Sequence, residues 1–451
     1  MKHLFTVFLI VSCSIFVSAE APEFGNENAL RKAKEFTVRG GCPNFRKKAE
    51  KGNAKIAYLG GSITEQNGWR ILSFEYLRDL YWDAEIKRID AAIGGTGSFL
   101  GVFRIDQDVL KFKPDLIFIE FAVNDRNIPS NEIRRSMEGI VRKTRRALPE
   151  TDLCFVYTIV KPDLEALFHG KMSRAASVME EVADYYEIPS VHMGVRVAEL
   201  AKQGKLLFQA KRENMRIVSG AALNISADIP VTSDGKIPFS PDGVHPYENT
   251  GHVLYMDALK HALPEFLKAG SPGKHPLPLP IAENNYEYTK MLSWNDPAVK
   301  LHGNIASLDS ENQIAKWFLK RMPDLRRFSP GSSFEFRFKG TTALLYGLFG
   351  PGTGSVEITV DHGQPRLERM FDAYSSYYRI VAITLANTLS DTVHTIRVRV
   401  SEKTFDKGTI LNDRKSFDAH PDLYTPLDGY FGAVLLAGEI LPFHSTSPSG
   451  Q

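Results

Sequence analysis

Four short segments of the sequence carry polar residues of the kinds that acyl transfer needs. Ser62 follows the apolar run IAYLGG, and the glycine-rich stretch AAIGGTGS contains Gly95. Asn124 lies in FAVND, after a third apolar run, and SPDGVHP contains Asp242 and His245. A serine hydroxyl attacks a carbonyl only when a histidine accepts its proton and a carboxylate orients that histidine. Hydrogen-bond donors must also be in place for the oxyanion that forms.

These residues have predicted roles in one nucleophilic site. Ser62 is the candidate nucleophile, His245 the candidate base and Asp242 the candidate orienting carboxylate. The backbone N–H groups of Ser62 and Gly95 and the side-chain amide of Asn124 are candidate oxyanion donors. Each residue alone has a simpler explanation, because a serine at a helix start is often a cap and glycine or asparagine often forms a turn. The consistent order of the four segments favours the catalytic interpretation.

Short apolar runs and longer amphipathic stretches alternate between these segments. Strands are predicted near 55–61, 84–95, 115–125, 152–160 and 188–194. Helices are predicted near 68–82, 99–112, 131–148, 172–186 and 250–269. This alternation predicts βαβ units and a parallel sheet with helices on both faces. Such sheets gather active-site groups outside the carboxyl ends of their strands, so we expect the four segments to meet there.

Two segments of this half raise separate questions. The run RRSMEGIVRKTRRALP is densely basic and also carries apolar residues near helical spacing, which predicts a core-facing helix with a solvated basic face. The stretch at 207–241 is turn-rich and polar. An active-site rim and a surface insertion without function are equally compatible with it.

The second half of the chain has a different pattern. Residues 269–285 are rich in proline and glycine, which predicts a linker. Beyond it, SSFEFRFKG, GSVEITVDHG and HTIRVRVSEK alternate apolar and polar residues with period two. This alternation predicts an antiparallel β-sandwich, jelly-roll-like, over residues 286–451. A lead segment at 20–50 and an α/β domain at 51–268 complete the expected organisation.

The N-terminus begins MKHLFTVFLIVSCSIFVSAEAPEF, a lysine followed by an apolar run and small residues. This pattern predicts a secretory signal peptide over residues 1–19, cleaved after Ala19, and hence a secreted or periplasmic protein. The run is short for a membrane anchor, and no later segment is long and apolar enough to span a bilayer. Lipidation of Cys13 is disfavoured, because LIVSC lacks the small residue expected before such a cysteine.

Composition and motifs exclude several other chemistries. The formal net charge is +2, spread along the chain, so nothing indicates a nucleic-acid partner. No HExxH, CxxC pair or GxxxxGK[ST] is present, so no metal or cofactor is predicted. His252 and His261 are expected to be partly exposed helix residues, and Cys42 and Cys154 do not indicate a dependence on disulfides. The sequence does not indicate an oligomeric state.

The order of the four segments resembles that of the SGNH hydrolase superfamily, the GDSL-like esterases and lipases. GGSIT looks like the first block, AAIGGTGS the second, FAVND the third and SPDGVHP the last, over residues 54 to about 268. The resemblance implies a three-layer α/β/α sandwich with a five-stranded parallel sheet, of the flavodoxin-like kind. Two residues depart from the family pattern, because Gly61 replaces an acidic residue and Asp90 an asparagine. The second departure leaves Gly94 as the alternative to Gly95 as oxyanion glycine.

The resemblance implies a serine esterase that acts through an acyl-enzyme. Because β-sandwich modules on secreted hydrolases often touch glycans, an O-acetyl ester on a polysaccharide or oligosaccharide is the expected substrate by analogy. Trp69, Phe121 and Tyr247 adjoin the motif residues and are either sugar-stacking or core aromatics. The alternatives are a lipase or lysophospholipase-type esterase, a glycan O-acyltransferase, and a non-catalytic glycan-binding protein. The lack of a long apolar lid disfavours long acyl chains.

Overall fold

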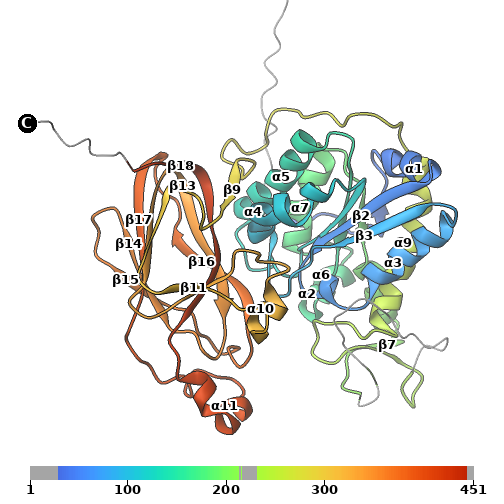
Figure 1. Ribbon diagram of the computed structural model, residues 1–451. Coiled ribbons are helices and arrows are strands. Elements are labelled where there is room, and N and C mark those ends of the chain that lie inside the picture. The colour runs from blue at the N-terminus through green and yellow to red at the C-terminus, as the bar shows by residue number, and fades with distance from the viewer. Residues whose placement is uncertain (1–28, 213–214, 216–230, 444–451) are drawn as a thin grey trace, which may run out of the picture.

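The computed structural model describes residues 29–212, 215 and 231–443. The predicted signal peptide at 1–19 lies outside the described residues, as does 216–230 within the predicted polar loop. No helix in these described ranges is long and apolar enough to cross a membrane. The chain forms an α/β unit and a β-rich unit, drawn on the right and left of Figure 1.

The first unit is built on a six-stranded sheet in the order β1-β6-β5-β4-β2-β3. Five of the strands run parallel, as predicted, and β1 joins the edge antiparallel to β6. The central strand β4 is buried along its whole length, as a strand covered on both faces must be. The strands are β1 (Phe36–Thr37), β2 (Asn53–Gly60), β3 (Glu85–Asp90), β4 (Leu116–Glu120), β5 (Asp152–Tyr157) and β6 (Ser190–His192).

Helices cover both faces of this sheet, so the expected three-layer α/β/α arrangement is confirmed (Figure 1). One face packs against α1 (Pro43–Glu50), α3 (Trp69–Leu80), α8 (Gly194–Lys202) and α9 (Gly251–Lys268). The other packs against α4 (Ser98–Asp108), α5 (Ser130–Ala147) and α7 (Arg174–Tyr185). Shorter elements are α2 (Ser62–Glu65), α6 (Leu164–Phe168), two 3-10 turns (Leu110–Phe112, Lys161–Asp163) and the strand pair β7 (Leu206–Gln209) and β8 (Ile237–Ser240). The sequence pattern predicts neither α1 nor α8.

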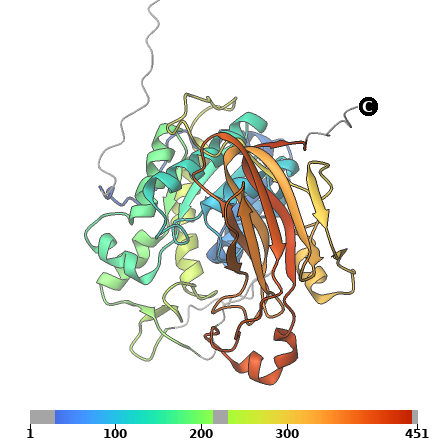
Figure 2. The same cartoon turned by 90° about the vertical axis from the view of Figure 1, so that its left-hand side faces the viewer.

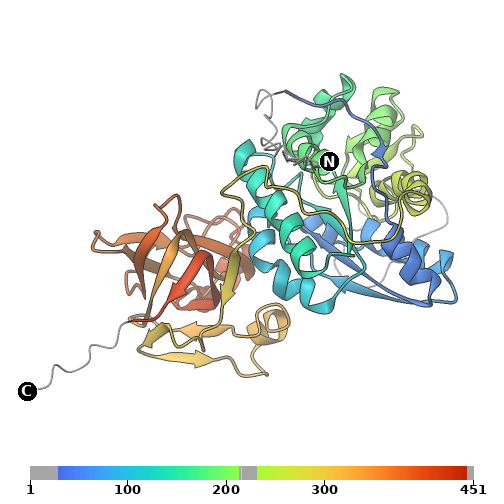
Figure 3. The same cartoon turned by 90° about the horizontal axis from the view of Figure 1, so that it is seen from above.

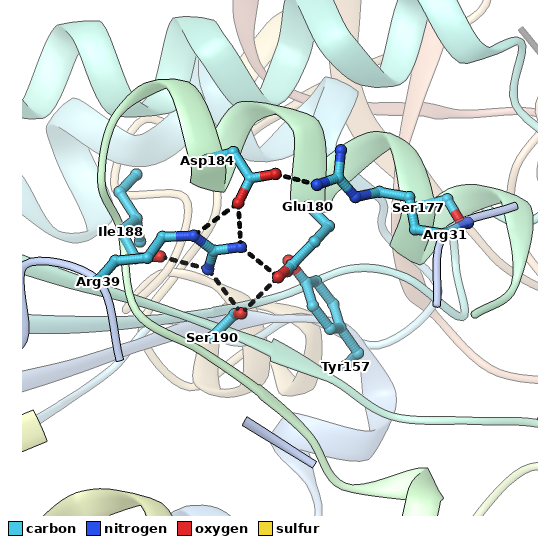
Figure 4. A network of polar contacts seen from close by, with 8 residues as sticks. All are labelled: Arg31, Arg39, Tyr157, Ser177, Glu180, Asp184, Ile188 and Ser190. Atoms are coloured by element: carbon cyan, nitrogen blue, oxygen red, sulfur yellow. Dashed lines mark hydrogen bonds and ion pairs between the residues drawn. The ribbon is translucent and has the colours of Figure 1, made fainter. Parts of the chain in front are cut away.

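A partly buried ionic network ties the lead segment to the edge of the sheet (Figure 4). The Arg39 guanidinium donates to the carbonyl of Ile188 and to the hydroxyl of Ser190, both at 2.8 Å. The same guanidinium forms ion pairs with Glu180 and Asp184 of α7. These hydrogen bonds offset the loss of hydration that burying an ion pair costs. The segment therefore becomes an ordered edge, although the sequence pattern predicts no element there.

The basic face of α5 is buried, which corrects the predicted solvated face. Arg142, Lys143 and Arg145 are 4%, 7% and 6% exposed. The predicted linker runs along this helix (Figure 3) and covers the two arginines, whereas Lys143 Nζ donates to the carbonyls of Val102 in α4 and Thr289 in β9, both at 3.0 Å. Arg142 Nη1 donates to the carbonyl of Pro278 at 2.7 Å, and Arg145 Nη1 donates to that of Pro276 at 2.5 Å. Proline has no N–H, so this segment offers more acceptors than donors and suits the cationic donors of α5.

The second unit is an antiparallel β structure, as predicted. Its longest strand, β13, pairs with β17 along its first half, with β16 along its second half, and with β18. Phe334, Phe336 and Phe338 alternate along β13 and are at most 1% exposed, so the period-two pattern marks the core face. Figure 2 views these strands from the side opposite the α/β unit.

The elements of the second unit follow one another along the chain from Thr289 to Leu441. The strands are β9 (Thr289–Leu292), β10 (Val299–His302), β11 (Ile305–Ser307), β12 (Arg326–Phe328), β13 (Ser333–Phe349), β14 (Ser355–Val360), β15 (Arg366–Arg369), β16 (Arg379–Ala386), β17 (Thr392–Val400) and β18 (Gly429–Leu441). The helices are α10 (Gln313–Phe318), α11 (Lys415–Ala419) and a 3-10 turn at Pro421–Tyr424.

The apolar core continues from the first unit into the second. Tyr286, at the end of the linker, is 1% exposed, and its ring lies 5.3 Å from that of Phe99 and 5.9 Å from that of Phe103, centroid to centroid. Leu344 and Tyr346 of β13 belong to the same buried cluster as the apolar residues of α4 and α5. Because they share a core, the two units stabilise each other, and the second is not a flexibly tethered module.

Gly139 of α5 provides a test of this close packing. A Cβ at Gly139 would lie 2.9 Å from the carbonyl carbon of Tyr286 and 2.8 Å from a methyl group of Val102. Alanine is favoured over glycine by about 1 kcal/mol inside a helix, but overpacking costs about 1–3 kcal/mol. We therefore expect Gly139→Ala to lower the midpoint of thermal unfolding, measured by circular dichroism.

The matched control is Gly273→Ala in the linker, where a Cβ would meet no atom within 4 Å. Its unfolding midpoint is expected to stay within about 1 °C of the unmodified protein, since isolated surface substitutions are close to neutral. A Gly139→Ala protein that is more stable than the parent would contradict a tightly packed junction between the units.

Candidate active site

Ser62 occupies the corner between β2 and α2, at the carboxyl edge of the parallel sheet. Strand β2 ends at Gly60, Gly61 is extended (φ −94°, ψ −154°), and Ser62 is the first residue of α2. The strands on either side of β2 are β3 and β4, and the loops after them carry Gly95 and Asn124. The parallel order therefore brings three of the four predicted segments to adjacent strand ends.

His245 approaches Ser62 from the loop between β8 and α9. Its Nε2 lies 2.9 Å from Ser62 Oγ, and its Nδ1 lies 2.7 Å from Asp242 Oδ2. The N–H groups of Val244 and His245 donate to Asp242 Oδ1 at 2.9 and 2.8 Å, and the Ser240 hydroxyl donates to it at 3.0 Å. The structure thus places a hydroxyl, an imidazole and a carboxylate in one hydrogen-bonded chain, which is the geometry for moving a proton from oxygen to nitrogen.

The hydrogen bonds around Asp242 keep its carboxyl ionised. Partial burial would raise the pKa of Asp242, but hydrogen bonds from the His245 ring and from the N–H groups of His245 and Val244 outweigh burial and lower the pKa to about 2. A carboxylate that accepts from Nδ1–H leaves Nε2 as the proton acceptor for Ser62. The same negative charge stabilises the imidazolium that forms when the proton is transferred.

The glycine turn after β3 lies beside Ser62. The position of a Cβ on Gly94 would be 3.6 Å from Ser62 Cβ. The Gly94 N–H already donates to Glu65 Oε2 at 2.8 Å, which disfavours Gly94 as the oxyanion donor. Gly95 follows with φ +75°, in the left-handed region that favours glycine, and it lines the cleft in front of the serine. Of the two glycines, Gly95 is therefore the better candidate donor.

Asn124 packs its side-chain amide against Gly61, next to the serine. A Cβ on Gly61 would lie only 2.0 Å from Asn124 Oδ1 and 3.3 Å from Nδ2. A side chain at position 61 therefore collides with the amide, which gives a physical reason for glycine at this position. The contact brings a third candidate donor to the corner that carries Ser62.

Two buried charged residues that the sequence analysis missed support this corner. Arg70 of α3 is 3% exposed; its Nε donates to the carbonyl of Thr64 at 2.9 Å, and its Nη1 pairs with Asp90 at 2.6 Å. Glu120 ends β4 and accepts from the hydroxyls of Thr64 and Thr158 at 2.8 and 2.6 Å, while burial raises its pKa. Neither residue belongs to a motif, so no sequence signal distinguishes it from ordinary helix and strand residues.

The serine faces a cleft of about 550 Å³ that lies between the two units. The first unit contributes Ser62, Gly95 and His245, and the second contributes residues of α10 and of the segment before β16. Among these, Trp317 and Tyr377 are each 57% exposed. The sequence analysis missed both, because they lie in the other half of the chain and outside any motif.

The three aromatic residues for which sugar stacking and a place in the core were the alternatives are buried. Trp69 and Phe121 are fully buried and Tyr247 is 2% exposed. The Tyr247 hydroxyl donates to the carbonyl of Ala210 at 2.9 Å and accepts from the N–H of Arg212 at 3.0 Å, which anchors the start of the polar loop. The substrate-contact interpretation of these residues is therefore corrected, because adjacency to a motif in sequence does not place a side chain in the cleft.

His252 is fully buried, in contrast to the predicted partial exposure. Its Nδ1 accepts from the N–H of Trp69 at 3.2 Å. Burial, with smaller contributions from the neighbouring His245 and Arg70, lowers the pKa of His252 to about 3 and keeps the ring neutral. Within the described ranges, no three His, Cys, Asp or Glu side chains are grouped so as to hold a metal ion.

Comparisons with known proteins agree with this fold. Residues 58–213 match the model of the GDSL-like Lipase/Acylhydrolase family, a segment that includes Ser62, Gly95 and Asn124 and ends before Asp242 and His245. The resemblance on which the sequence prediction relied is thus confirmed for this segment. A comparison with curated protein sequences gives no match.

Two solved structures share the two-unit architecture. A two-domain esterase (CEX) active on acetylated mannans has a TM-score of 0.64 at 21% identity, and the match covers 90% of this chain and 98% of that chain. The same kind of esterase co-crystallized with mannopentaose has a TM-score of 0.63 at 20% identity, with the same coverage. At this level of identity, the likeness shows a common fold for both units.

The contact between Gly61 and Asn124 predicts an energetic coupling. Gly61→Ala places a methyl group against the amide, so we expect a lower free energy of unfolding. Asn124→Ala removes the obstructing amide, so the double variant should lose less stability than the two single variants together. Denaturant unfolding of the four proteins measures the coupling, expected at about 1–3 kcal/mol. Strictly additive losses would contradict the contact.

Proposed function

We propose that this chain, whose residues 58–213 match the GDSL-like acylhydrolase family, is a serine esterase. The observation that carries the proposal is the chain of contacts from Ser62 Oγ to His245 Nε2 at 2.9 Å and from His245 Nδ1 to Asp242 at 2.7 Å. A serine hydroxyl is too weak an acid to be a nucleophile unaided, and this arrangement supplies the base and orients it.

In the first half-reaction, Ser62 Oγ attacks the ester carbonyl while His245 Nε2 takes the hydroxyl proton. The carbonyl oxygen becomes an oxyanion, which accepts hydrogen bonds from the N–H groups of Ser62 and Gly95 and from the Asn124 amide. Donors of this kind act mainly on the transition state, and each is worth about 3 kcal/mol of barrier. The tetrahedral intermediate then expels the alcohol, which takes the proton back from His245, and leaves an acyl-Ser62.

In the second half-reaction, water replaces the alcohol. His245 removes a proton from the water, whose oxygen attacks the acyl carbonyl in the same oxyanion site. Collapse of this second intermediate breaks the bond to Ser62 Oγ and returns the proton to it. The products are the free carboxylic acid and the regenerated enzyme, and Asp242 stays ionised throughout.

The proposed substrate is an O-acetyl ester on a polysaccharide or oligosaccharide. Exposed aromatic rings at Trp317 and Tyr377 face the cleft that holds Ser62, and such rings suit the apolar faces of sugars. The solved structures with the same two-unit fold are of an esterase active on acetylated mannans, which supports this substrate class by analogy. The signal peptide predicted at 1–19 would bring the enzyme to the periplasm or the exterior.

Ser62→Ala tests the reaction itself. We expect it to reduce kcat/KM for 4-nitrophenyl acetate by about a thousandfold or more, because no other group supplies the nucleophile. Release of 4-nitrophenolate measures the rate, and thermal unfolding shows that the fold is kept. Unchanged turnover would refute the assignment. Turnover of the octanoate ester faster than the acetate would favour a lipase-type enzyme, and acetyl groups recovered on sugar rather than as free acetate would favour a transferase.

Trp317→Ala and Tyr377→Ala test the substrate class. Each should raise KM for an acetylated mannan or xylan oligosaccharide by about tenfold, equivalent to about 1.4 kcal/mol of lost binding. Hydrolysis of 4-nitrophenyl acetate, which carries no sugar, should change less than twofold in the same variants.

Trp82→Ala is the matched control, since Trp82 lies just beyond the end of α3, is 84% exposed and does not line the cleft. It should leave both activities unchanged. Equal losses on the oligosaccharide and on the aryl acetate in the Trp317 and Tyr377 variants would argue against sugar stacking.

A further inference from the structure

We propose that the second unit orders the oxyanion site through Arg321, a positioning residue that acts by way of Glu65 on the glycine turn. This inference rests on the proposed esterase function. It gives the contacts between the two units a role in positioning an oxyanion donor. Arg321 follows α10, whereas Glu65 is the last residue of α2, the helix that begins with Ser62. The contact therefore links the β-rich unit directly to the helix of the proposed nucleophile.

The two oxygens of the Glu65 carboxylate have different partners. Oε1 forms an ion pair with Arg321 Nη2 at 3.0 Å, and Oε2 accepts from the Gly94 N–H at 2.8 Å. The other terminal nitrogen of Arg321 donates to the carbonyl of Ala92, in the same turn. One guanidinium thus holds the turn twice, directly at Ala92 and through Glu65 at Gly94.

Arg321 is itself held firmly in the second unit. Its N–H donates to the carbonyl of Phe318 at 2.9 Å, and its own carbonyl accepts from the side chain of Gln107 on α4 at 3.2 Å. The next residue, Met322, is 2% exposed in the core shared by both units. The guanidinium is therefore presented from a fixed backbone and not from a loose surface loop.

The glycine turn needs such support. Gly94 and Gly95 are adjacent, and glycine loses more conformational freedom on folding than any other residue. An oxyanion donor contributes fully only when its N–H is aimed, before the reaction, at the position where charge develops. Contacts at the Ala92 carbonyl and the Gly94 N–H hold the 92–93 and 93–94 peptide units. They thereby restrict the directions open to the next peptide unit, which carries the N–H of Gly95.

Arg321 also lines the cleft, so a direct contact with substrate is the competing explanation. The two roles differ in what they change. A positioning residue acts on kcat even for a small ester without a sugar, whereas a substrate contact acts on KM for the glycan. A side chain that only stabilises the fold changes the unfolding midpoint and neither kinetic constant selectively.

The experiment compares Arg321→Ala, Arg321→Lys, Glu65→Ala and the double variant Arg321→Ala/Glu65→Ala in the full chain. For 4-nitrophenyl acetate we expect Arg321→Ala to lower kcat by about ten- to a hundredfold, with KM within about twofold. Arg321→Lys should show a smaller decrease in kcat than Arg321→Ala. Lysine keeps the positive charge but lacks the two terminal nitrogens with which the guanidinium makes its two contacts. The double variant should lose less kcat than the two single losses multiplied together, because only one of the two Arg321 contacts with the turn passes through Glu65.

Hydrogen exchange of the peptide that covers residues 91–97 gives a readout independent of turnover. Faster exchange in Arg321→Ala, with an unchanged unfolding midpoint, is the expected result. Arg399→Ala is the matched control, because Arg399 pairs with Glu402 in the same unit and does not line the cleft. It should leave both kcat and exchange unchanged.

Unchanged exchange in Arg321→Ala, or unchanged kcat on the aryl acetate, would overturn the proposal, as would a loss confined to KM for the glycan. If the unmodified protein did not hydrolyse the ester at all, the esterase proposal would fail. The exchange measurement would then still decide whether Arg321 orders the turn, so the two failures are distinguishable.

Discussion

The candidate site depends on the parallel register of three neighbouring strands. Gly60, at the end of β2, lies opposite Glu120 at the end of β4, and β3 runs parallel on the other side of β2. The chain therefore leaves all three strands at one edge, where Ser62, Gly95 and Asn124 follow. A shift of one residue in this register would move every side chain of the shifted strand to the opposite face of the sheet and separate these groups. The loop that carries the histidine can complete the site only because this edge is fixed.

Three carboxyl groups around Ser62 differ in burial, in hydrogen bonding and in ion pairing. Asp242 accepts several hydrogen bonds and has a pKa of about 2, so it is a stable negative partner for an imidazole. Glu120 is fully buried, which raises its pKa, and its carboxyl accepts hydrogen bonds from two threonine hydroxyls. Glu65 pairs with Arg321 at the mouth of the cleft. Burial and hydrogen bonding, rather than residue type, decide which carboxyl can serve the proton transfer.

The second unit is an integral part of the folded protein and not an appendage. Its apolar residues continue the core of α4 and α5, and its α10 region forms one wall of the cleft. Buried arginines on α5 donate hydrogen bonds to carbonyl groups of the proline-rich linker. These bonds hold the path of the chain that leads into the second unit. A change in this unit can therefore alter both the proposed sugar-binding surface and the geometry of the glycine turn beside Ser62. Removing it would expose part of a common core, so point substitutions are the cleaner probe of its role.

The sequence by itself determined the alternation of strands and helices, the antiparallel second half, and the order of Ser62, Gly95, Asn124 and His245. These features are local, because periodicity and turn residues report on neighbours along the chain. The sequence analysis was wrong about the exposure of the α5 cations and of His252, because their burial depends on distant segments. For the same reason it left open whether the aromatic residues beside the motifs contact substrate or lie in the core. It did not find Arg321 or the exposed aromatic rings of the cleft. Only the tertiary structure decided which of these residues are buried and which line the cleft. Contacts between residues far apart in the chain do not change the local pattern of apolar and polar residues around either of them.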